Sequence, residues 1–275
     1  ILGDPSNLAE IELILATTTT LGKLGFKNFQ IRINERRILK AMAAYSGFPE
    51  ESYDSVFIIL DKMDKIGLEG VKEELIKYEF SPEAVEKYTD LFKELEGQKD
   101  PIAYLAEKLG DYMGDDVKEW MNEIIESVRA TKSSDFEIVF DPTLVRGMSY
   151  YTGTIFEISM DEFGGSVGGG GRYDKMIGKF TGQDTPAVGF SIGFERIVML
   201  LLERGYEVPT SKPKKAFLIE KKLPQEKLLE VLEEARKERE AGRQVMIVNM
   251  KKNKKFQKEQ LAEQGYTDIT EVYNG

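Results

Sequence analysis

The spacing of apolar residues predicts a helix, a strand and a second helix within residues 1–48. From Leu8 to Leu24 the spacing is helical, and the predicted buried side carries Ile11, Leu13, Ile14, Thr18 and Leu21. Asn7 is a plausible N-cap, and Gly25 ends the helix. The next stretch, "KNFQIRINE", alternates with the two-residue period of a strand and turns inward Phe29, Ile31 and Ile33. Residues 36–46 return to a helical pattern.

Residues 49–134 are predicted to be entirely helical. Segments such as "SPEAVEKYTDLFKELEG" and "DVKEWMNEIIESVRA" repeat apolar residues at intervals of three and four. Ser81, followed by acidic residues at 83 and 86, marks the start of one of these helices. The block contains no chemical motif, and we interpret it as a helical insertion or bundle.

The pattern changes to strands between 136 and 192, in "FEIVF", "GTIFEISM", "SVGGGG" and "AVGFSIG". An apolar helix follows and ends at Gly205, and Pro209 and Pro213 then bracket a polar linker. The remaining chain predicts a strand, a helix, a strand and a helix at 215–220, 225–241, 244–249 and 255–264. This alternation indicates a small β/α unit with a mainly parallel sheet.

Composition excludes several kinds of chemistry. The chain of 275 residues has no cysteine and no histidine, which removes disulfides, thiolate metal sites, imidazole bases and nearly all zinc sites. No apolar run approaches the roughly 20 residues needed to cross a bilayer, and no signal peptide is recognised. The chain opens at Ile1 with a stretch typical of a strand leading into a loop, so we expect coding sequence upstream.

The net charge of −10 gives no global sign of nucleic-acid binding, but the charge is unevenly distributed. Residues 214–275 contain 14 Lys and Arg against 11 Asp and Glu. The run "KKNKK" at 251–255 is compatible with a solvated loop or helix start, and also with a surface that faces RNA.

Three stretches could carry chemistry, and the first is "LVRGMSYYTGTIFE" at 144–157. Arg146 could hold a carboxylate or phosphate with its planar guanidinium. Tyr150 and Tyr151 are expected on opposite faces of a strand, so only one of them can face a given pocket. The structural alternative is an arginine in a surface ion pair beside tyrosines that pack on a sheet.

The second stretch, "GGSVGGGGRYD", holds four consecutive glycines at 168–171. Glycines weaken a strand and allow a ligand or another backbone to approach closely. The stretch lacks the Lys-Ser/Thr end of a P-loop and the surroundings of a dinucleotide fingerprint. A flexible hairpin loop is the alternative, although Arg172 and Tyr173 favour a site.

The third stretch, "PAVGFSIGFERIVMLL", places Arg196 in the first turn of an apolar helix. The helix dipole disfavours a cation there, so a bound anion such as a phosphate is a natural partner. A salt bridge to Glu195 or another nearby carboxylate is the alternative.

Together, the three stretches resemble the signature blocks of histidyl-tRNA synthetases. The first two are similar to the family's two histidine-recognition blocks, and the third to motif 3 of class II synthetases. "ILDKMDKIGLEGV" also resembles the stretch that leads into the family's helical insertion.

The resemblance implies a role for each matching residue. Arg146 would stabilise charge between the histidine carboxylate and the ATP α-phosphate, and Arg196 would hold the γ-phosphate with Mg²⁺. Histidine would be bound by Tyr150, Tyr151, Tyr173, Gly169 and Gly170. The tRNA backbone would be contacted by Lys251, Lys252, Lys254 and Lys255.

The same resemblance implies ATP and Mg²⁺ as a substrate complex, with no permanently bound cofactor and no resident metal site. It implies histidine and tRNA(His) as further substrates, a homodimeric parent protein, no membrane association and a cytoplasmic location. Three departures stand out: Ser149 replaces a frequent acidic residue, the last domain is short, and motifs 1 and 2 are absent. Without motif 2, which supplies further ATP and histidine contacts, we expect the chain alone to be inactive.

The predicted fold class is α+β. We expect a partial class II synthetase antiparallel sheet at 1–48 and 135–208, interrupted by a helical insertion at 49–134, and a shortened α/β anticodon-binding domain at 214–275. The alternative function is that of a non-catalytic, synthetase-like regulatory subunit of ATP phosphoribosyltransferase. That class lacks the anticodon domain, so the final β/α unit favours the ligase.

Overall fold

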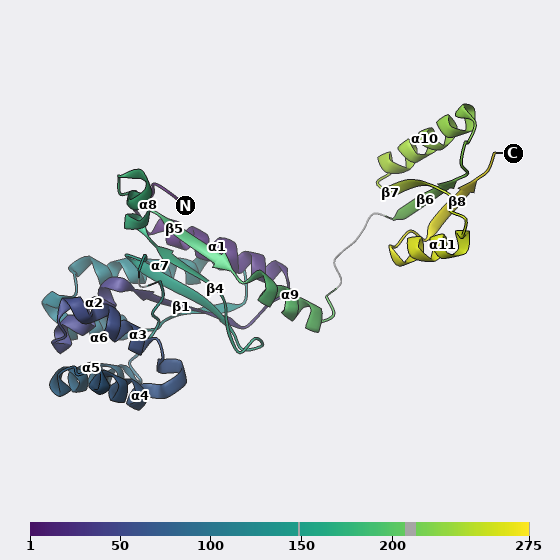
Figure 1. The fold of residues 1–275 in the computed structure, drawn as a ribbon. Coiled ribbons are helices and arrows are strands. Elements are labelled where there is room, and N and C mark those ends of the chain that lie inside the picture. Colours follow the sequence, from purple (N-terminus) through teal and green to yellow (C-terminus); the bar gives the residue numbers. More distant parts are fainter. Residues whose placement is uncertain (148, 207–212, 275) are drawn as a thin grey trace. The chain divides into compact units, whose positions relative to one another are not determined.

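The computed structural model describes residues 1–147, 149–206 and 213–274. The chain divides into two compact units, Ile1–Arg204 and Gly205–Gly275 (Figure 1). The predicted linker at 209–213 lies outside the described residues, apart from Pro213. The α+β fold class predicted from the sequence is confirmed.

The first unit is built on a five-stranded sheet of order β2-β1-β3-β4-β5. Only β1 and β2 are parallel, and the other neighbouring pairs are antiparallel. The alternation predicted for the first strand is confirmed, because Phe29, Ile31 and Ile33 are all buried. The strands are β1 (Phe29–Glu35), β2 (Phe136–Phe140), β3 (Thr154–Met160), β4 (Gly165–Arg172) and β5 (Val188–Ile192).

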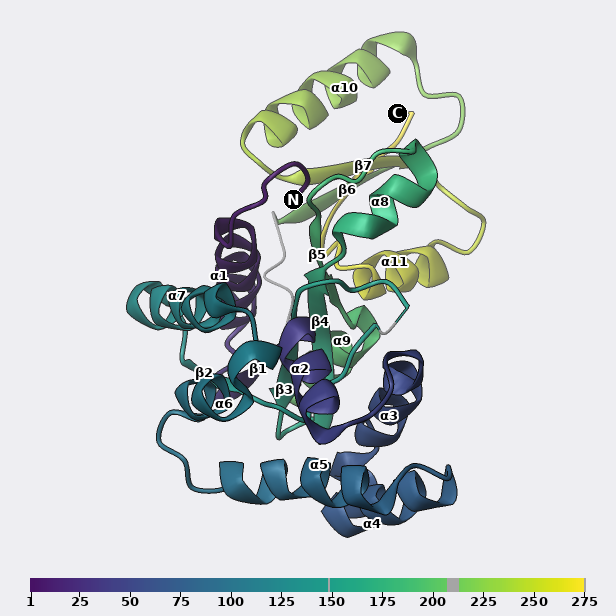
Figure 2. The ribbon, with the colours of Figure 1, turned by 90° about the vertical axis from the view of Figure 1, so that its left-hand side faces the viewer.

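Helices α1 and α7 lie side by side and pack against the sheet, α7 on β1 and β2 and α1 on β5 (Figure 2). A helical region joins β1 to β2. It comprises α2 (Arg36–Ser46), η1 (Glu50–Ser52), α3 (Tyr53–Leu60), α4 (Met63–Lys77), α5 (Pro82–Leu95), α6 (Pro101–Leu109), η2 (Gly110–Tyr112) and α7 (Asp115–Thr131). The remaining helices of the unit are α1 (Leu8–Lys23), α8 (Asp174–Thr181) and α9 (Phe194–Glu203).

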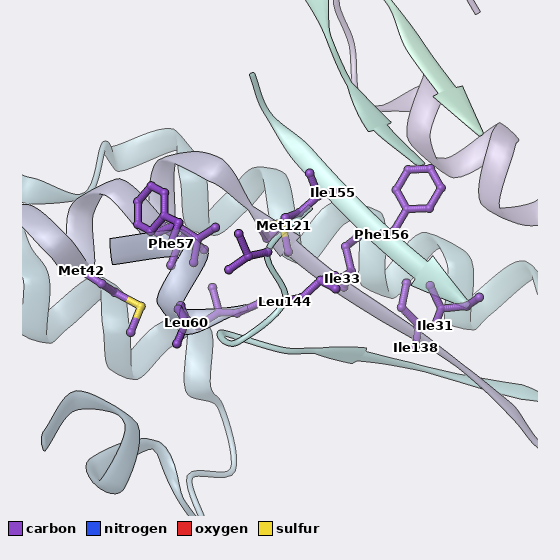
Figure 3. Close-up of a cluster of buried hydrophobic side chains, with 14 of the residues drawn as sticks. Ile31, Ile33, Met42, Phe57, Leu60, Met121, Ile138, Leu144, Ile155 and Phe156 are labelled. Carbon is purple, nitrogen blue, oxygen red and sulfur yellow. The ribbon is translucent and has the colours of Figure 1, made fainter. Parts of the chain in front are cut away.

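One continuous hydrophobic core joins the sheet to the helical region. In Figure 3, Ile31, Ile33 and Phe156 of the sheet belong to the same cluster of buried side chains as Met42, Phe57, Leu60 and Met121 of the helices. Because this core is shared, the helices of the predicted insertion are held firmly to the sheet.

The sequence predicted the position of two helix starts correctly, but the side chains expected to cap these helices do not do so. Asn7 does precede α1, but its amide donates to Glu123 Oε2 at 2.7 Å and does not cap the helix. Ser81 precedes α5, and its side chain likewise makes no capping hydrogen bond. At α1, the contact between Asn7 and Glu123 takes the place of a local cap. At α5, Pro82 stands at the first helical position, where its fixed backbone angle favours the start of a helix.

The second unit alternates β6 (Lys214–Ile219), α10 (Gln225–Glu240), β7 (Gln244–Asn249), α11 (Lys254–Glu263) and β8 (Asp268–Val272). Its sheet has the order β7-β6-β8 and is entirely parallel, which confirms the predicted β/α alternation. Separate apolar clusters lie under α10 and under α11, so the two helices cover opposite faces. Sequence reasoning missed β8 and, in the first unit, α8.

Among the described residues, no helix combines the length and the hydropathy that crossing a bilayer requires.

Candidate active site

The glycine run forms the interior strand β4, not a hairpin loop. Gly168–Gly171 pair with Ile155–Ile158 of β3 on one side and with residues 189–192 of β5 on the other. A methyl group on Gly170 would lie 2.0 Å from the Gly189 carbonyl oxygen. The neighbouring strands therefore supply the close backbone approach that the glycines permit.

Antiparallel register places alternate glycines on one sheet face. Arg32, Glu157, Gly169 and Ser191 lie opposite one another on four adjacent strands and so project from the same side. Gly171 and Gly189 belong to this face as well, since they are two residues away along β4 and β5. At three positions this face therefore has no side chain of its own, and polar side chains stand beside these positions.

Three of the predicted site residues cover these three glycines. The positions where a methyl group would stand are 2.8 Å from Arg146 Cζ at Gly169, 3.0 Å from Tyr151 Cδ1 at Gly171, and 2.5 Å from the Tyr173 hydroxyl at Gly189. Arg146, Tyr151 and Tyr173 therefore lie over bare backbone, side by side on one face.

The expectation that Tyr150 and Tyr151 point to opposite faces is wrong. Both residues precede β3, and both backbone N–H groups donate to the Gly147 carbonyl in a turn. Their ring centroids are 4.4 Å apart, and those of Tyr151 and Tyr173 are 6.3 Å apart. A turn, unlike a strand, can bring adjacent side chains together, so three tyrosines form one aromatic cluster. Tyr150 is its most exposed member.

Burial and the neighbouring Tyr150 raise the pKa of Tyr151 to about 12. The phenol therefore remains neutral at physiological pH and can both donate and accept a hydrogen bond. An imidazole also has one donor and one acceptor, so the two groups are chemically complementary.

Arg146 is only partly engaged by the protein. Its Nη1 contacts Glu157 Oε2 and lies 3.4 Å from Ser166 Oγ. Within the described part of the chain, its Nε and Nη2 have no hydrogen-bond partner. The side chain is 31% exposed, so one edge of the guanidinium is available to an incoming oxygen atom.

Arg196 reaches the same strand from the start of α9. Its Nη1 donates to the Ser166 carbonyl at 2.5 Å, and its guanidinium lies 5.4 Å from the Phe163 ring centroid. Ser166 thus contacts Arg146 through its hydroxyl and Arg196 through its carbonyl. Among the described residues Arg196 forms no ion pair with Glu195 or with any other carboxylate, so its exposed guanidinium keeps its charge unpaired beside the site.

Arg172 is not part of this face, although its position after the glycines suggested a site. Its guanidinium is buried, donates to both Glu10 oxygens at 2.6 and 2.7 Å, and lies 5.4 Å from the Trp120 ring centroid. It also donates to the carbonyls of Asp4 and Ser6, just before α1, at 3.3 and 2.7 Å. Arg172 therefore joins α1 to β4 and is a structural residue.

Sequence reasoning missed Arg32 and Glu157. Glu157 contacts Arg146 through one oxygen, and its other oxygen lies 3.5 Å from Arg32 Nη1. The sequence signal was that both are charged residues at polar positions of an alternating strand, which marks them as lying on the same kind of sheet face but does not pair them. No group of His, Cys, Asp and Glu side chains suited to a metal ion occurs among the described residues.

The predicted lysines lie in the second unit around the start of α11. Lys251 and Lys252 are exposed in the loop after β7, and Lys255 is exposed in the first turn. Lys254 differs, because its ammonium lies 3.1 Å from the Tyr273 hydroxyl and 3.7 Å from Glu271. Lys221 and Lys222, which the sequence analysis did not single out, follow β6 at the same edge of the parallel sheet.

Comparison with known proteins gives a consistent result. The sequence model of one family, described as histidyl-tRNA synthetase, matches residues 1–197. The histidine–tRNA ligase of Leifsonia xyli subsp. xyli is 37% identical and aligns with 99% of this chain and 62% of its own length. That of Aeropyrum pernix is 35% identical over 74% of this chain and 46% of its own length. The chain therefore spans less than two thirds of the length of these relatives.

Solved structures give the same picture. The histidyl-tRNA synthetase from Nostoc sp. PCC 7120 is 27% identical, with a TM-score of 0.75 over 96% of this chain and 62% of the other. A Bacillus halodurans C protein, described as an ATP phosphoribosyltransferase regulatory subunit/histidyl-tRNA synthetase, is 22% identical, with a TM-score of 0.76 over 100% of this chain and 67% of the other. At that identity the likeness concerns the fold alone.

Proposed function

Because the chain belongs to the histidyl-tRNA synthetase family, we propose that it is part of a longer, cytoplasmic histidine–tRNA ligase, here called the parent. The parent activates histidine with ATP to histidyl-adenylate and transfers it to tRNA(His). ATP enters with Mg²⁺ as a substrate complex, and the parent works as a homodimer. The observation that best supports this proposal is the convergence of Arg146, Tyr151 and Tyr173 over Gly169, Gly171 and Gly189.

In this proposal the aromatic cluster binds the histidine side chain. Tyr151 exchanges a hydrogen bond with the imidazole, and Tyr150 and Tyr173 flank it. Gly169 keeps the floor of the site flat, since any side chain there would occupy the place of the Arg146 guanidinium. Gly170, which the sequence also assigned to histidine binding, faces the other side of the sheet, because neighbouring residues of a strand point to opposite faces.

The two arginines act on the ATP phosphates. Adenylate formation joins a histidine carboxylate oxygen to the α-phosphorus and breaks the bond from that phosphorus to the pyrophosphate oxygen. Negative charge builds at this junction, where the free edge of Arg146 stabilises it. Arg196, linked to the same strand through Ser166, holds the terminal phosphate.

ATP–pyrophosphate exchange by the parent tests these roles. Arg146→Ala should lower kcat about 10²- to 10³-fold with little change in KM for histidine, because the charge it meets develops mainly in the transition state. Tyr151→Phe should mainly raise KM for histidine, since it removes one hydrogen bond worth about 0.5–1.5 kcal/mol. Equal effects of both substitutions on KM, with kcat unchanged, would exclude the role given to Arg146.

The chain alone should not catalyse this exchange at a useful rate, because the family's motif 2 contacts are not in it. Purified residues 1–275 are expected to give no histidine-dependent exchange above background. Exchange near the rate of the parent would contradict the proposal.

A regulatory subunit remains the second candidate, because a structure with that description matches the fold along the whole chain. The fold therefore does not separate the two functions, and the final β/α unit is a weaker discriminator than the sequence suggested. The sequence identity of 35–37% to proteins named histidine–tRNA ligase favours the enzyme. Absence of exchange by the parent, with stimulation of an ATP phosphoribosyltransferase, would support the alternative.

A further inference from the structure

We propose that Glu157 is a positioning residue for Arg146, held in place by the charge network Asp64–Arg32–Glu157–Arg146. This inference rests on the proposed function, because it concerns how the arginine of that site is oriented. None of the roles assigned above includes Glu157, Arg32 or Asp64.

The contacts of Arg146 identify Glu157 as its main restraint. The Glu157 carboxylate is the only acidic group in the described residues that forms an ion pair with Arg146. The Ser166 hydroxyl at 3.4 Å is a long contact and contributes less. Removing the Glu157 charge would leave Arg146 over Gly169 with no carboxylate at ion-pair distance among the described residues, and only the longer-range attraction of Asp61 would remain.

Glu157 is itself fixed from the other side. It lies in the middle of β3, its side chain is 14% exposed, and Arg32 Nη1 is 3.5 Å from the oxygen that does not contact Arg146. A carboxylate shared between two guanidiniums has little rotational freedom, so its position defines that of Arg146.

Arg32 differs from Arg146 in having every guanidinium nitrogen engaged. Its Nε contacts Asp141, its Nη1 donates to Asp64 at 2.9 Å, and its Nη2 is 3.3 Å from the Thr143 hydroxyl. Burial opposes its charge, but Asp141 and Asp64 outweigh burial and raise its pKa. Arg32 is therefore a permanently charged anchor, and Arg146 is the member of the network with a free edge.

Asp64 extends the network to the first turn of α4. Three residues later, Gly67 has φ 67° and ψ 176°, a non-helical conformation inside α4 that favours glycine. The first turn is thus separated from the rest of α4 by a backbone break, so Asp64 can keep its contact with Arg32 independently of the following helix.

The test uses ATP–pyrophosphate exchange by the parent carrying Glu157→Gln. An amide keeps the shape but removes the charge, so kcat should fall about 10- to 100-fold, as expected for a misplaced group. KM for histidine should change less than twofold. Glu157→Asp keeps the charge and should retain more activity than Glu157→Gln, which a purely steric role does not predict.

Two controls make the result specific. Glu162→Gln alters an exposed glutamate that pairs with Arg204, and it should leave kcat unchanged. Unfolding of residues 1–275 that carry the same substitution, followed by fluorescence of Trp120, their only tryptophan, reports whether the variant has lost the fold of the first unit. An unchanged midpoint with reduced kcat supports positioning.

Three outcomes overturn the inference. Wild-type kcat for Glu157→Gln, while Arg146→Ala is inactive, refutes the role of Glu157 and leaves the proposed function intact. Normal exchange by Arg146→Ala refutes the role given to Arg146, on which the inference rests, whereas absence of exchange by the unmodified parent refutes the proposed function itself. If the loss in Glu157→Gln is recovered by raising Mg²⁺, Glu157 holds the metal that accompanies ATP, and it does not position Arg146.

Discussion

At the scale of single residues, the candidate site depends on the absence of side chains as much as on their presence. Gly169, Gly171 and Gly189 give one sheet face a bare floor, and Arg146, Tyr151 and Tyr173 occupy the space above it. Glycine weakens a strand. Here pairing on both sides of β4 offsets that weakness.

Gly169→Ala in the parent tests this arrangement. Its new methyl group would lie 2.8 Å from Arg146 Cζ and 2.8 Å from the Phe156 carbonyl oxygen, so the guanidinium must move. We expect kcat for pyrophosphate exchange to fall about 10²-fold, because misplacement by about 1 Å has effects of that size.

Gly165→Ala, in the same strand, is the matched control. Its nearest heavy atom would be Phe163 Cδ1 at 4.0 Å, so the methyl group meets no obstacle. If Gly169→Ala is as active as Gly165→Ala, Arg146 does not need its observed position.

At the scale of secondary structure, buried charge joins elements that are distant in sequence. Glu10 in α1 pairs with Arg172 at the end of β4, and both side chains are almost completely buried. Trp120 of α7 lies against the same arginine and donates to Thr154 of β3 at 3.0 Å. These contacts fix α1 and α7 to the sheet that carries the site.

Arg172→Met should destabilise the first unit by about 3–5 kcal/mol, because it leaves the Glu10 carboxylate buried without its partner. Urea unfolding monitored by Trp120 fluorescence measures the change. Lys93→Met, which breaks an exposed pair with Asp90, should cost about 0–1 kcal/mol. Similar costs for the two variants would mean that the buried pair contributes no more than a surface one.

Glu35, at the junction of β1 and α2, should make stability depend on pH. Burial raises its pKa, and the nearby Arg37 only partly opposes the shift. A carboxyl group with a raised pKa in the folded state binds its proton more tightly there than in the unfolded chain. Its contribution to stability is therefore complete below the ordinary glutamate pKa of about 4.3 and is lost as pH rises through the folded-state value.

Glu35→Gln removes this titration, so its unfolding free energy should fall less than that of the unmodified chain as pH is raised from about 4 to 7. Trp120 fluorescence in urea at a series of pH values provides the measurement. Glu12→Gln, at an exposed position of α1, should leave the pH profile unaltered. Parallel profiles for Glu35→Gln and the unmodified chain would show that Glu35 titrates normally.

At the scale of the whole molecule, the two units carry their candidate binding residues on different kinds of surface. The site of the first unit is built from a sheet face, whereas the lysines of the second unit follow the carboxyl ends of parallel strands. Lys251, Lys252 and Lys255 are exposed, and Lys254 is held by Tyr273 and Glu271. Binding of the tRNA backbone, if the lysines provide it, should therefore depend on the first three.

Replacing Lys251, Lys252 and Lys255 with Ala in the parent should weaken tRNA binding and flatten its salt dependence. Each lost contact to a single-stranded phosphate changes the slope of log K against log salt by about 0.7. Pyrophosphate exchange should be unaffected. Lys237→Ala, on α10 beside Glu233, is the control. Salt titrations that coincide for the triple variant and the parent would mean that the lysines are merely solvated.

The sequence by itself determined the elements whose pattern is local. Alternation placed β1, helical spacing placed α1 and the helices of 49–134, and the β/α alternation of the second unit was readable without contacts. Residue types also narrowed the chemistry, since a chain without histidine or cysteine leaves arginine, tyrosine and carboxylates. The order of the three signature stretches pointed to the family.

Only the tertiary structure decided which residues meet. Strand register set Glu157 opposite both Arg32 and Gly169, and no local pattern encodes which strands become neighbours. Tyr150 lies beside Tyr151 because the two residues belong to a turn and not to a strand. Arg172 lies outside the site because its guanidinium pairs with Glu10, which is distant in the sequence. The physical reason is that hydrophobic periodicity records only which side of an element is buried, whereas ion pairs and close backbone contacts depend on the partner that burial brings near.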